Sequence, residues 1–458
     1  MPFYAIWAQN YKNILIYANF FVPLRRKMKK FLSCIVLFVL CTGLQALPHY
    51  ELAYRLGGFG AAMMPDGKVD EWIQRPVLGG SFAVEFLPTG RWHSLQQWNN
   101  ASIGVGATYL NLGNNAKLGS AFAAYGYINQ PFYNGNHFRI GLRPTVGLAA
   151  VDKRYSNTYE GEHPYHDHKG ANWSIGSVLN AYLAVDLYMD FPIKDGWDIT
   201  LSGGWHHISN GSIMHPNAGY NIFGGELGVR YHPEVTKEQS TKYEAPETDV
   251  PHKLYDGVDK PWVVEFSATG GIKQNYYADN RDGQLFFGAA TVKLAAYWVP
   301  VSIFRLGAGV DAFYDGYYKC VNRNFAAANP DAPVTYFGKT YLKESNIKNC
   351  FRVGLSIQPE LIIGRLTAGL HVGFYVFDPV KNLEPFDEAK AADEVGKTLN
   401  RGIFYGYDFS KASNYQDGWC YMQFILKYHV LDHLFVQLGL KTHGVRAEFI
   451  DAGIGVAF

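Results

Sequence analysis

The sequence predicts an all-β protein whose antiparallel strands close into a membrane-spanning barrel. Apolar residues alternate with small or polar ones over much of the chain, which is the two-residue period of a strand and not the 3.6-residue period of a helix. Aromatic residues make up 16% of the chain and charged residues only 18%, against roughly 25% charged residues in soluble domains. In lipid only helices and closed barrels satisfy every backbone hydrogen bond, so strands of this composition indicate a barrel.

Composition and charge argue against three other classes of protein. The 41 basic and 40 acidic residues nearly cancel, whereas a nucleic-acid-binding protein would show a basic excess. The 32 Tyr, 30 Phe and 10 Trp argue against a disordered chain. One apolar run approaches the length of a membrane-spanning helix, and it lies near the N-terminus, which excludes a helical membrane protein.

The N-terminal segment, residues 1–46, has the pattern of a secretory signal. Met28 is followed by two lysines, then by the apolar run 31–40, then by small and polar residues up to Ala46. This order predicts initiation at Met28 and cleavage near Ala46, with residues 1–27 as an upstream extension. A membrane anchor is the alternative interpretation. A secreted chain enters an oxidising compartment, so a disulfide between Cys320 and Cys350 is possible.

Strand-like segments follow one another along the rest of the chain. The first half has eight of them: 49–62, 80–88, 101–111, 118–128, 137–150, 171–190, 197–209 and 221–232. The second half has nine: 261–272, 284–298, 303–317, 351–362, 365–377, 402–409, 418–429, 433–443 and 446–458. A polar, proline-containing linker at 235–260 separates a first barrel region, 47–234, from a second, 261–458. Two small barrels and one barrel of about sixteen strands both fit this count.

The last strand indicates which membrane the barrel occupies. Its alternation places Glu448, Ile450 and Ile454 on one face, which is apolar toward the terminus. The chain ends in Phe458, which resembles the terminal aromatic residue of bacterial outer-membrane barrels that assists recognition by the barrel assembly machinery. We therefore expect an outer-membrane location. A soluble β-sandwich is the alternative, but it would not need so many aromatic residues.

The chemistry concentrates in residues 205–221. The strand at 197–209 has one apolar face, formed by Trp197, Ile199, Leu201 and Trp205, which must face lipid. By alternation His207 and Ser209 lie on this same face, at one end of the strand. Polar side chains are costly on a lipid face and therefore suggest function. A histidine within reach of a serine can act as its base, although a polar girdle beside Trp205 is the alternative.

The next strand supplies a partner for the histidine. Asn221 lies on the lipid-facing side with His207, whereas Glu226 and Arg230 face the lumen, where we expect them to pair with each other. Glu226 is the next acidic residue along the chain, but it cannot easily orient His207 because the two side chains lie on opposite sides of the barrel wall.

These residues resemble a known family. The pattern His207-x-Ser209-Asn210, followed by Pro216-Asn217-x-Gly219-x-Asn221, is similar to that of the outer-membrane lipid A 3-O-deacylases, also called acyloxyacyl hydrolases. Residues 109–114 and 172–180 also look like segments of these proteins, and the resemblance covers about 48–235. It implies an eight-stranded barrel that hydrolyses an ester of lipid A in lipopolysaccharide and releases a 3-hydroxy fatty acid.

The resemblance also implies roles for individual residues. Ser209 would be the nucleophile and His207 its general base, with Asn210, Asn217 and Gly211 around the oxyanion and substrate. Asn221 stands where the family has an acid. An amide can orient an imidazole, but it lacks the charge with which a carboxylate stabilises the imidazolium. Neither a metal nor a cofactor is expected.

Other functions remain open. A non-enzymatic pore or structural barrel is one alternative, and a phospholipase is another. Residues 162–168 cluster three histidines, which suits either a metal site or a solvated loop. His443 is expected to face the lumen in a structural role. Residues 261–458 carry no visible chemistry and fit a second barrel, a pore or a platform for partners, and the sequence leaves the oligomeric state open.

Overall fold

The structure is a computed structural model that describes most of the predicted strand regions. The described residues are 52–65, 69–88, 95, 98–158, 171–194, 196–214, 216–232, 262–274, 286–301, 303–316, 335–336, 339–340, 347–378, 420–444 and 446–458. The predicted signal segment, the linker, the strand expected at 402–409, the histidine cluster at 162–168 and Cys320 lie outside them. Among the described residues no helix is both long and apolar enough to cross a membrane.

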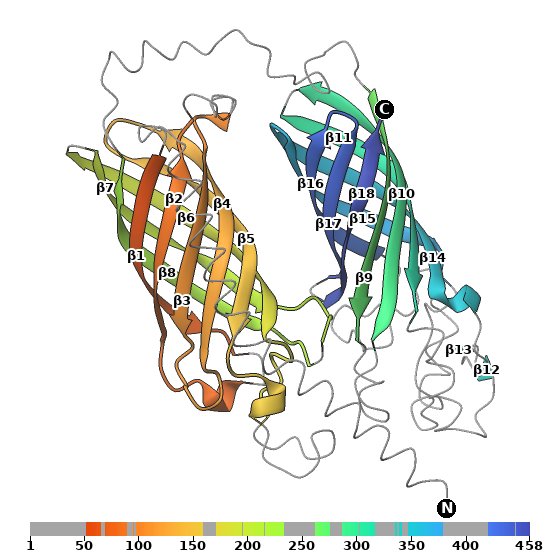
Figure 1. Cartoon of the computed structure of the whole chain (residues 1–458), viewed down its shortest axis with the longest axis horizontal. Coiled ribbons are helices and arrows are strands. Elements are labelled where there is room, and N and C mark those ends of the chain that lie inside the picture. The colour runs from red at the N-terminus through yellow and green to blue at the C-terminus, as the bar shows by residue number, and fades with distance from the viewer. Residues whose placement is uncertain are drawn as a thin grey trace, which may run out of the picture.

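The first half of the chain forms a closed antiparallel barrel of eight strands (Figure 1). Its strands are β1 (Leu52–Met63), β2 (Val77–Phe86), β3 (Ser102–Asn111), β4 (Ser120–Asn134), β5 (Arg139–Val151), β6 (Leu179–Lys194), β7 (Trp197–Ser209) and β8 (Tyr220–Tyr231). Each strand pairs with the next in sequence, and β8 pairs with β1 to close the barrel.

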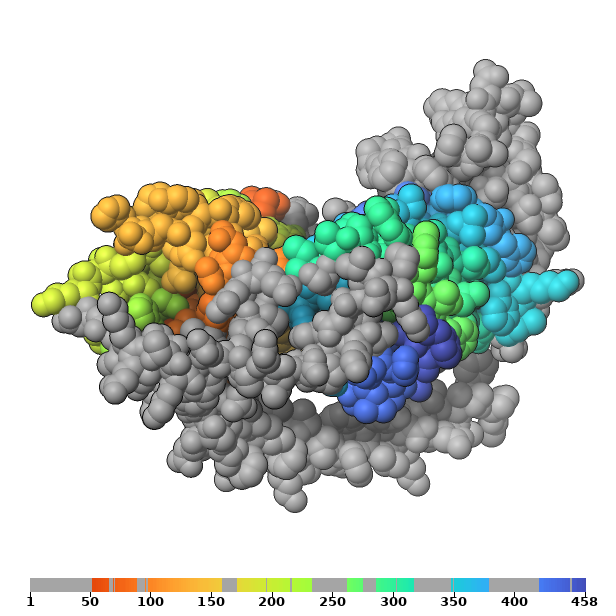
Figure 2. Space-filling view, turned by 90° about the horizontal axis from the view of Figure 1, so that it is seen from above, coloured from red at the N-terminus to blue at the C-terminus, as the bar shows by residue number. Residues whose placement is uncertain are grey.

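The second half forms another closed barrel of eight strands, so the protein has two small barrels and not one large one. Its strands are β9 (Trp262–Lys273), β10 (Phe287–Val301), β11 (Phe304–Asp315), β14 (Phe351–Ile363), β15 (Leu366–Phe377), β16 (Cys420–Leu431), β17 (Leu434–His443) and β18 (Arg446–Ala457). The short strands β12 (Thr335–Tyr336) and β13 (Lys339–Thr340) pair with each other outside the barrel. Figure 2 shows the two barrels side by side.

Both barrels have the side-chain distribution of proteins that span a membrane. On β1 the side chain of Leu56 is 62% exposed on the outside, whereas its neighbour Arg55 is 4% exposed inside the barrel. The same alternation of apolar outward and polar inward residues follows the other strands, because successive strand residues point to opposite faces. An apolar outer wall around a polar interior is the pattern expected of a barrel in lipid.

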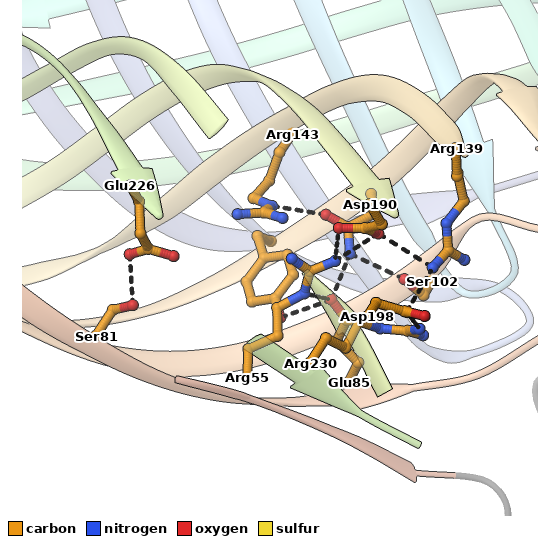
Figure 3. A network of polar contacts seen from close by, with 12 residues as sticks. Arg55, Ser81, Glu85, Ser102, Arg139, Arg143, Asp190, Asp198, Glu226 and Arg230 are labelled. Carbon is orange, nitrogen blue, oxygen red and sulfur yellow. Dashed lines mark hydrogen bonds and ion pairs between the residues drawn. The ribbon is translucent and has the colours of Figure 1, made fainter. Parts of the chain in front are cut away.

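Paired charges fill the lumen of the first barrel (Figure 3). Glu85 accepts hydrogen bonds from Arg55 and from Arg230, and Arg230 also donates to Asp198 at 2.6 Å. Glu226 instead accepts from Ser81, away from this cluster. The expectation that Glu226 and Arg230 pair was therefore wrong, because the barrel wall brings stronger partners for Arg230 from β2 and β7.

The lumen of the second barrel is also charged, and it corrects the predicted position of Glu448. That side chain lies inside the barrel, 5% exposed, bonded to Arg352 and Lys441. The pairing of β17 with β18 shifts register between Lys441 and Thr442. The bulge breaks the strict alternation that placed Glu448 on the same face as Ile450, because an extra residue changes which side faces inward. His443 faces the lumen as predicted and contacts Tyr375.

The two ends of each barrel differ. In the second barrel the turns at 302–303, 364–365 and 432–433 are short, and they lie at the end where β18 finishes. The strand ends that are joined by longer stretches of sequence lie at the opposite end, together with the end of β7 and the start of β8 (Figure 1). Short turns on the inner side and long loops on the outer side are characteristic of outer-membrane barrels. The end of β7 that carries Ser209 is therefore the outer end.

Candidate active site

The pairing of β7 with β8 brings together His207 and Asn221. These residues are direct partners across the two strands. The Nδ1 atom of His207 lies 2.9 Å from Oδ1 of Asn221, which also accepts a hydrogen bond from Nε1 of Trp205 at 3.3 Å. Since the amide oxygen can only accept, Nδ1 of His207 carries the proton. The other ring nitrogen, Nε2, is then free to accept a proton.

The Trp205 ring fixes the plane of the imidazole. The two rings stack with their centroids 5.3 Å apart and an angle of 19° between their planes. Trp205 and His207 are two residues apart on the same outward face of β7, which makes this stacking possible. The Asn221 hydrogen bond and the Trp205 ring together hold the His207 ring on the lipid-facing side.

Ser209 is the last residue of β7 and lies beyond His207 on the same face. Its side chain is partly exposed and makes no hydrogen bond within the part of the chain that the structure describes. The sequence therefore located the two side chains correctly on one face, but no hydrogen bond joins Ser209 to His207 in this structure.

A tight turn follows Ser209. The Ile213 N–H donates to the Asn210 carbonyl at 3.2 Å, and the two central residues, Gly211 and Ser212, have φ of 60° and 67°. Positive φ at both central positions defines a type I′ turn, for which glycine at the first position is favourable. The Asn210 side chain fastens the turn by donating from Nδ2 to the Met214 carbonyl at 2.7 Å.

Asn217 lies against this turn. Its Oδ1 accepts the backbone N–H of Asn210 at 2.8 Å, so its Nδ2 remains available as a donor. The backbone N–H of Asn210 is thereby occupied. The Gly211 N–H makes no hydrogen bond within the described residues. Of the three residues expected around the oxyanion, Asn217 and Gly211 therefore offer a donor. The N–H of Asn210 is bonded to Asn217, and its side chain is bonded to Met214 and Ser177.

The connection between β5 and β6 supports the site, a role that the sequence did not indicate. Ser177 Oγ accepts from Nδ2 of Asn210 at 2.9 Å, and the Ser174 carbonyl accepts the Gly219 N–H at 2.8 Å. Asn172 is fully buried and donates to the Tyr220 hydroxyl at 2.5 Å. The polar residues of 172–180 were visible in the sequence, but only the closed barrel brings them beside 210–220.

Gly219 is required where the loop passes the imidazole. Its φ is 82°, and a Cβ atom there would lie 2.7 Å from Cε1 and 3.2 Å from Nε2 of His207. Any side chain would therefore press against the Cε1–Nε2 edge of the ring, in addition to straining the backbone.

His206, next to His207, lies on the opposite side of the barrel wall. It contacts the Tyr182 hydroxyl at 2.7 Å and Asp186 at 3.1 Å in the lumen. The cavity beside it has a volume of about 30 Å³, which is room for about one water molecule and not for a lipid. The lumen therefore offers no substrate site there, and the only histidine of β7 that lipid can reach is His207.

The fold and the distribution of side chains define an outer-membrane β-barrel protein. Comparison with protein families then identifies the family. Residues 80–230 match the family described as lipid A 3-O-deacylase, PagL, and residues 262–388 and 397–458 match the C-terminal domain of acyloxyacyl hydrolase. The first barrel thus belongs to the lipid A 3-O-deacylase family, as the sequence motif predicted, and the protein is an outer-membrane hydrolase.

Solved structures of three barrels are similar to parts of the chain. The outer membrane enzyme PagL is 14% identical, with a TM-score of 0.24, and the match covers 39% of this chain and 98% of that one. Neisserial surface protein A is 15% identical with a TM-score of 0.24, covering 40% and 97%. A porin of Rhodopseudomonas blastica is 11% identical with a TM-score of 0.16, covering 89% and 100%. Comparison with curated proteins gives no match.

Proposed function

We propose that the first barrel removes a 3-O-linked hydroxyacyl chain from lipid A, with Ser209 and His207 as the catalytic pair. The observation that carries this proposal is the 2.9 Å contact between His207 and Asn221, on the lipid-facing side and beside Ser209. It supports a neutral imidazole whose Nε2 can accept a proton from a nearby hydroxyl. The match of residues 80–230 to the deacylase family supports lipid A as the substrate.

The proposed reaction has two steps. The Oγ atom of Ser209 attacks the ester carbonyl carbon while Nε2 of His207 takes its proton. The tetrahedral intermediate then collapses, the acyl chain stays on Ser209, and His207 returns the proton to the leaving sugar hydroxyl. In the second step His207 removes a proton from water, which attacks the acyl-serine and releases the hydroxy fatty acid.

Donors beside Ser209 stabilise the charged intermediate in this proposal. Nδ2 of Asn217 and the Gly211 N–H are the candidate donors, since Oδ1 of Asn217 is already bound to Asn210. One such donor contributes a factor of about 10²–10³ to the rate. Asn210 affects the oxyanion indirectly. Its side chain stabilises the turn through Met214, and its N–H positions the Asn217 side chain.

Mass spectrometry of lipid A after incubation with the purified, refolded protein tests the proposal. We expect loss of one hydroxyacyl mass with the wild-type protein and a rate at least about 10³-fold lower for Ser209→Ala. Ser202→Ala is the matched control, because Ser202 lies on the same strand but faces the lumen, 9% exposed. Intact lipid A with every protein, or acyl release from glycerophospholipid alone, would contradict the proposal.

A further inference from the structure

The second barrel touches the turn that carries the proposed oxyanion donor. The hydroxyl of Ser212 donates to the Ala447 carbonyl at 2.7 Å, and the Gln274 N–H donates to the Ser212 carbonyl at 2.9 Å. Gln274 follows β9 and Ala447 lies at the start of β18. Residues at the ends of two strands of the second barrel therefore form hydrogen bonds with one residue of this turn, through both its side chain and its backbone.

The neighbouring residue of the turn packs on an apolar pair of the second barrel. Ile450 and Leu440 are direct partners on β18 and β17, and both face outward. A Cβ atom on Gly211 would lie 2.5 Å from the Ile450 side chain and 3.5 Å from that of Leu440. Ile450 is partly buried, whereas Ile454, on the same face of the same strand, is 59% exposed. The first barrel therefore contacts this wall of the second barrel at the outer end.

These contacts act on the residues that immediately follow the proposed nucleophile. Gly211 and Ser212 are the two central residues of the type I′ turn, and both have positive φ. The ψ angle of Asn210 and the φ angle of Gly211 set the direction of the Gly211 N–H, and the turn holds both residues. A shift of that turn against the second barrel therefore moves an oxyanion donor relative to Ser209, and displacements of about 1 Å can cost on the order of 10²-fold in rate.

We propose that the second barrel is a positioning element of the active site, with Ile450 and the Ser212 contacts fixing the turn after Ser209. This inference rests on the proposed function, since it assigns the second barrel a part in the same reaction. Ile450 packs against the turn, so in this proposal it acts through Gly211.

A double-mutant cycle between the barrels in the full-length protein tests the inference. Gly211→Ala adds a methyl group that collides with Ile450, and Ile450→Ala removes the atoms that it meets. We expect Gly211→Ala to lower kcat on lipid A by about 10²-fold with KM little changed. The double variant Gly211→Ala with Ile450→Ala should have a kcat at least about tenfold higher than Gly211→Ala alone. The double variant with Ile454→Ala should have the same kcat as Gly211→Ala alone. The backbone strain of alanine at positive φ is present in both double variants and cancels.

The unfolding midpoint in denaturant, measured on the same variants, separates the possible failures. Recovery of the midpoint without recovery of kcat would leave the contact in place and overturn the positioning role. If neither the unfolding midpoint nor kcat recovers in the double variant, Gly211 and Ile450 are not in contact and the inference fails. A wild-type protein that releases no acyl chain would refute the proposed function and the positioning role together, while the midpoint cycle would still report whether the barrels touch here.

Discussion

The hydrogen bonds of a single amide set the state of the candidate base. Asn221 accepts from both His207 and Trp205 through one oxygen, so the imidazole must carry its proton on Nδ1. The amide therefore supplies the orientation that a carboxylate would supply, but without the negative charge. Orientation and charge are separate contributions to a catalytic triad. In this candidate site Asn221 supplies the orientation and no residue supplies the charge among the contacts of His207 that the structure describes.

Restoring the charge at this position should speed the reaction. In Asn221→Asp the side chain keeps its length, accepts the same two hydrogen bonds, and stabilises the imidazolium that forms as Ser209 loses its proton. We expect kcat for acyl release from lipid A to rise by about tenfold. The control is Asn221→Leu, which removes the acceptor and should lower kcat. An Asn221→Asp protein no faster than the wild type would show that the amide already suffices.

At the scale of the strand, β7 separates two histidines that are neighbours in sequence. His207 faces lipid beside Trp205, and His206 faces the lumen beside Asp186. The alternation of strand residues produces this separation without any loop or domain boundary. A buried histidine–aspartate pair resembles part of a triad, yet here it lies on the wrong side of the barrel wall for a lipid substrate.

The strands of the first barrel are also joined through their inward charges. Glu85 on β2 accepts from Arg55 on β1, from Arg230 on β8 and from Asn129 on β4. The side chain of Glu85 is fully buried, so its charge depends on these partners for stabilisation. This cluster ties the first and last strands of the barrel to its interior.

Neutralising Glu85 should destabilise the first barrel. Glu85→Gln leaves the guanidinium groups of Arg55 and Arg230 with less compensating charge in a buried site, which typically costs about 3–5 kcal/mol. We expect the free energy of unfolding, measured by denaturant titration in detergent or lipid, to fall by that amount. Glu71→Gln, at an exposed position, serves as the control and should change it by less than about 0.5 kcal/mol. Equal effects of the two substitutions would contradict a structural role for the cluster.

At the scale of the molecule, both barrels have the same orientation. In the second barrel the strand ends joined by the longest stretches of sequence lie at the end that carries Ser209, and the turns at 364–365 and 432–433 lie at the other end. The interior of each barrel is packed with charged and polar side chains. In the proposed function the substrate therefore meets the outer wall, and the relative position of the two walls affects the site.

This orientation can be checked on intact cells. An epitope inserted after Asn115, between β3 and β4, should be accessible to antibody and to added protease, because that turn lies at the outer end. The same epitope inserted after Asp432, between β16 and β17, should be protected until the outer membrane is opened. The opposite pattern would place the proposed active site on the inner leaflet, away from lipid A.

The sequence by itself determined the class of the protein and the face of the barrel wall on which the candidate site residues lie. Strand period and composition are local properties, so the barrel fold, the outward facing of His207, Ser209 and Asn221, and the family motif were all readable from it. Gly219 was visible as part of that motif, but its contact with the imidazole was not.

The tertiary structure alone decided how distant segments meet. Closure into two barrels, the partners of Arg230, the inward position of Glu448 and the support of Asn210 by Ser177 all depend on strand register. A bulge of one residue reverses the facing of a side chain, and no local pattern encodes it. The contact of Ser212 with Ala447 joins residues 235 positions apart. Only the packing of one barrel against the other could reveal it, because sequence periodicity describes each strand without its neighbours.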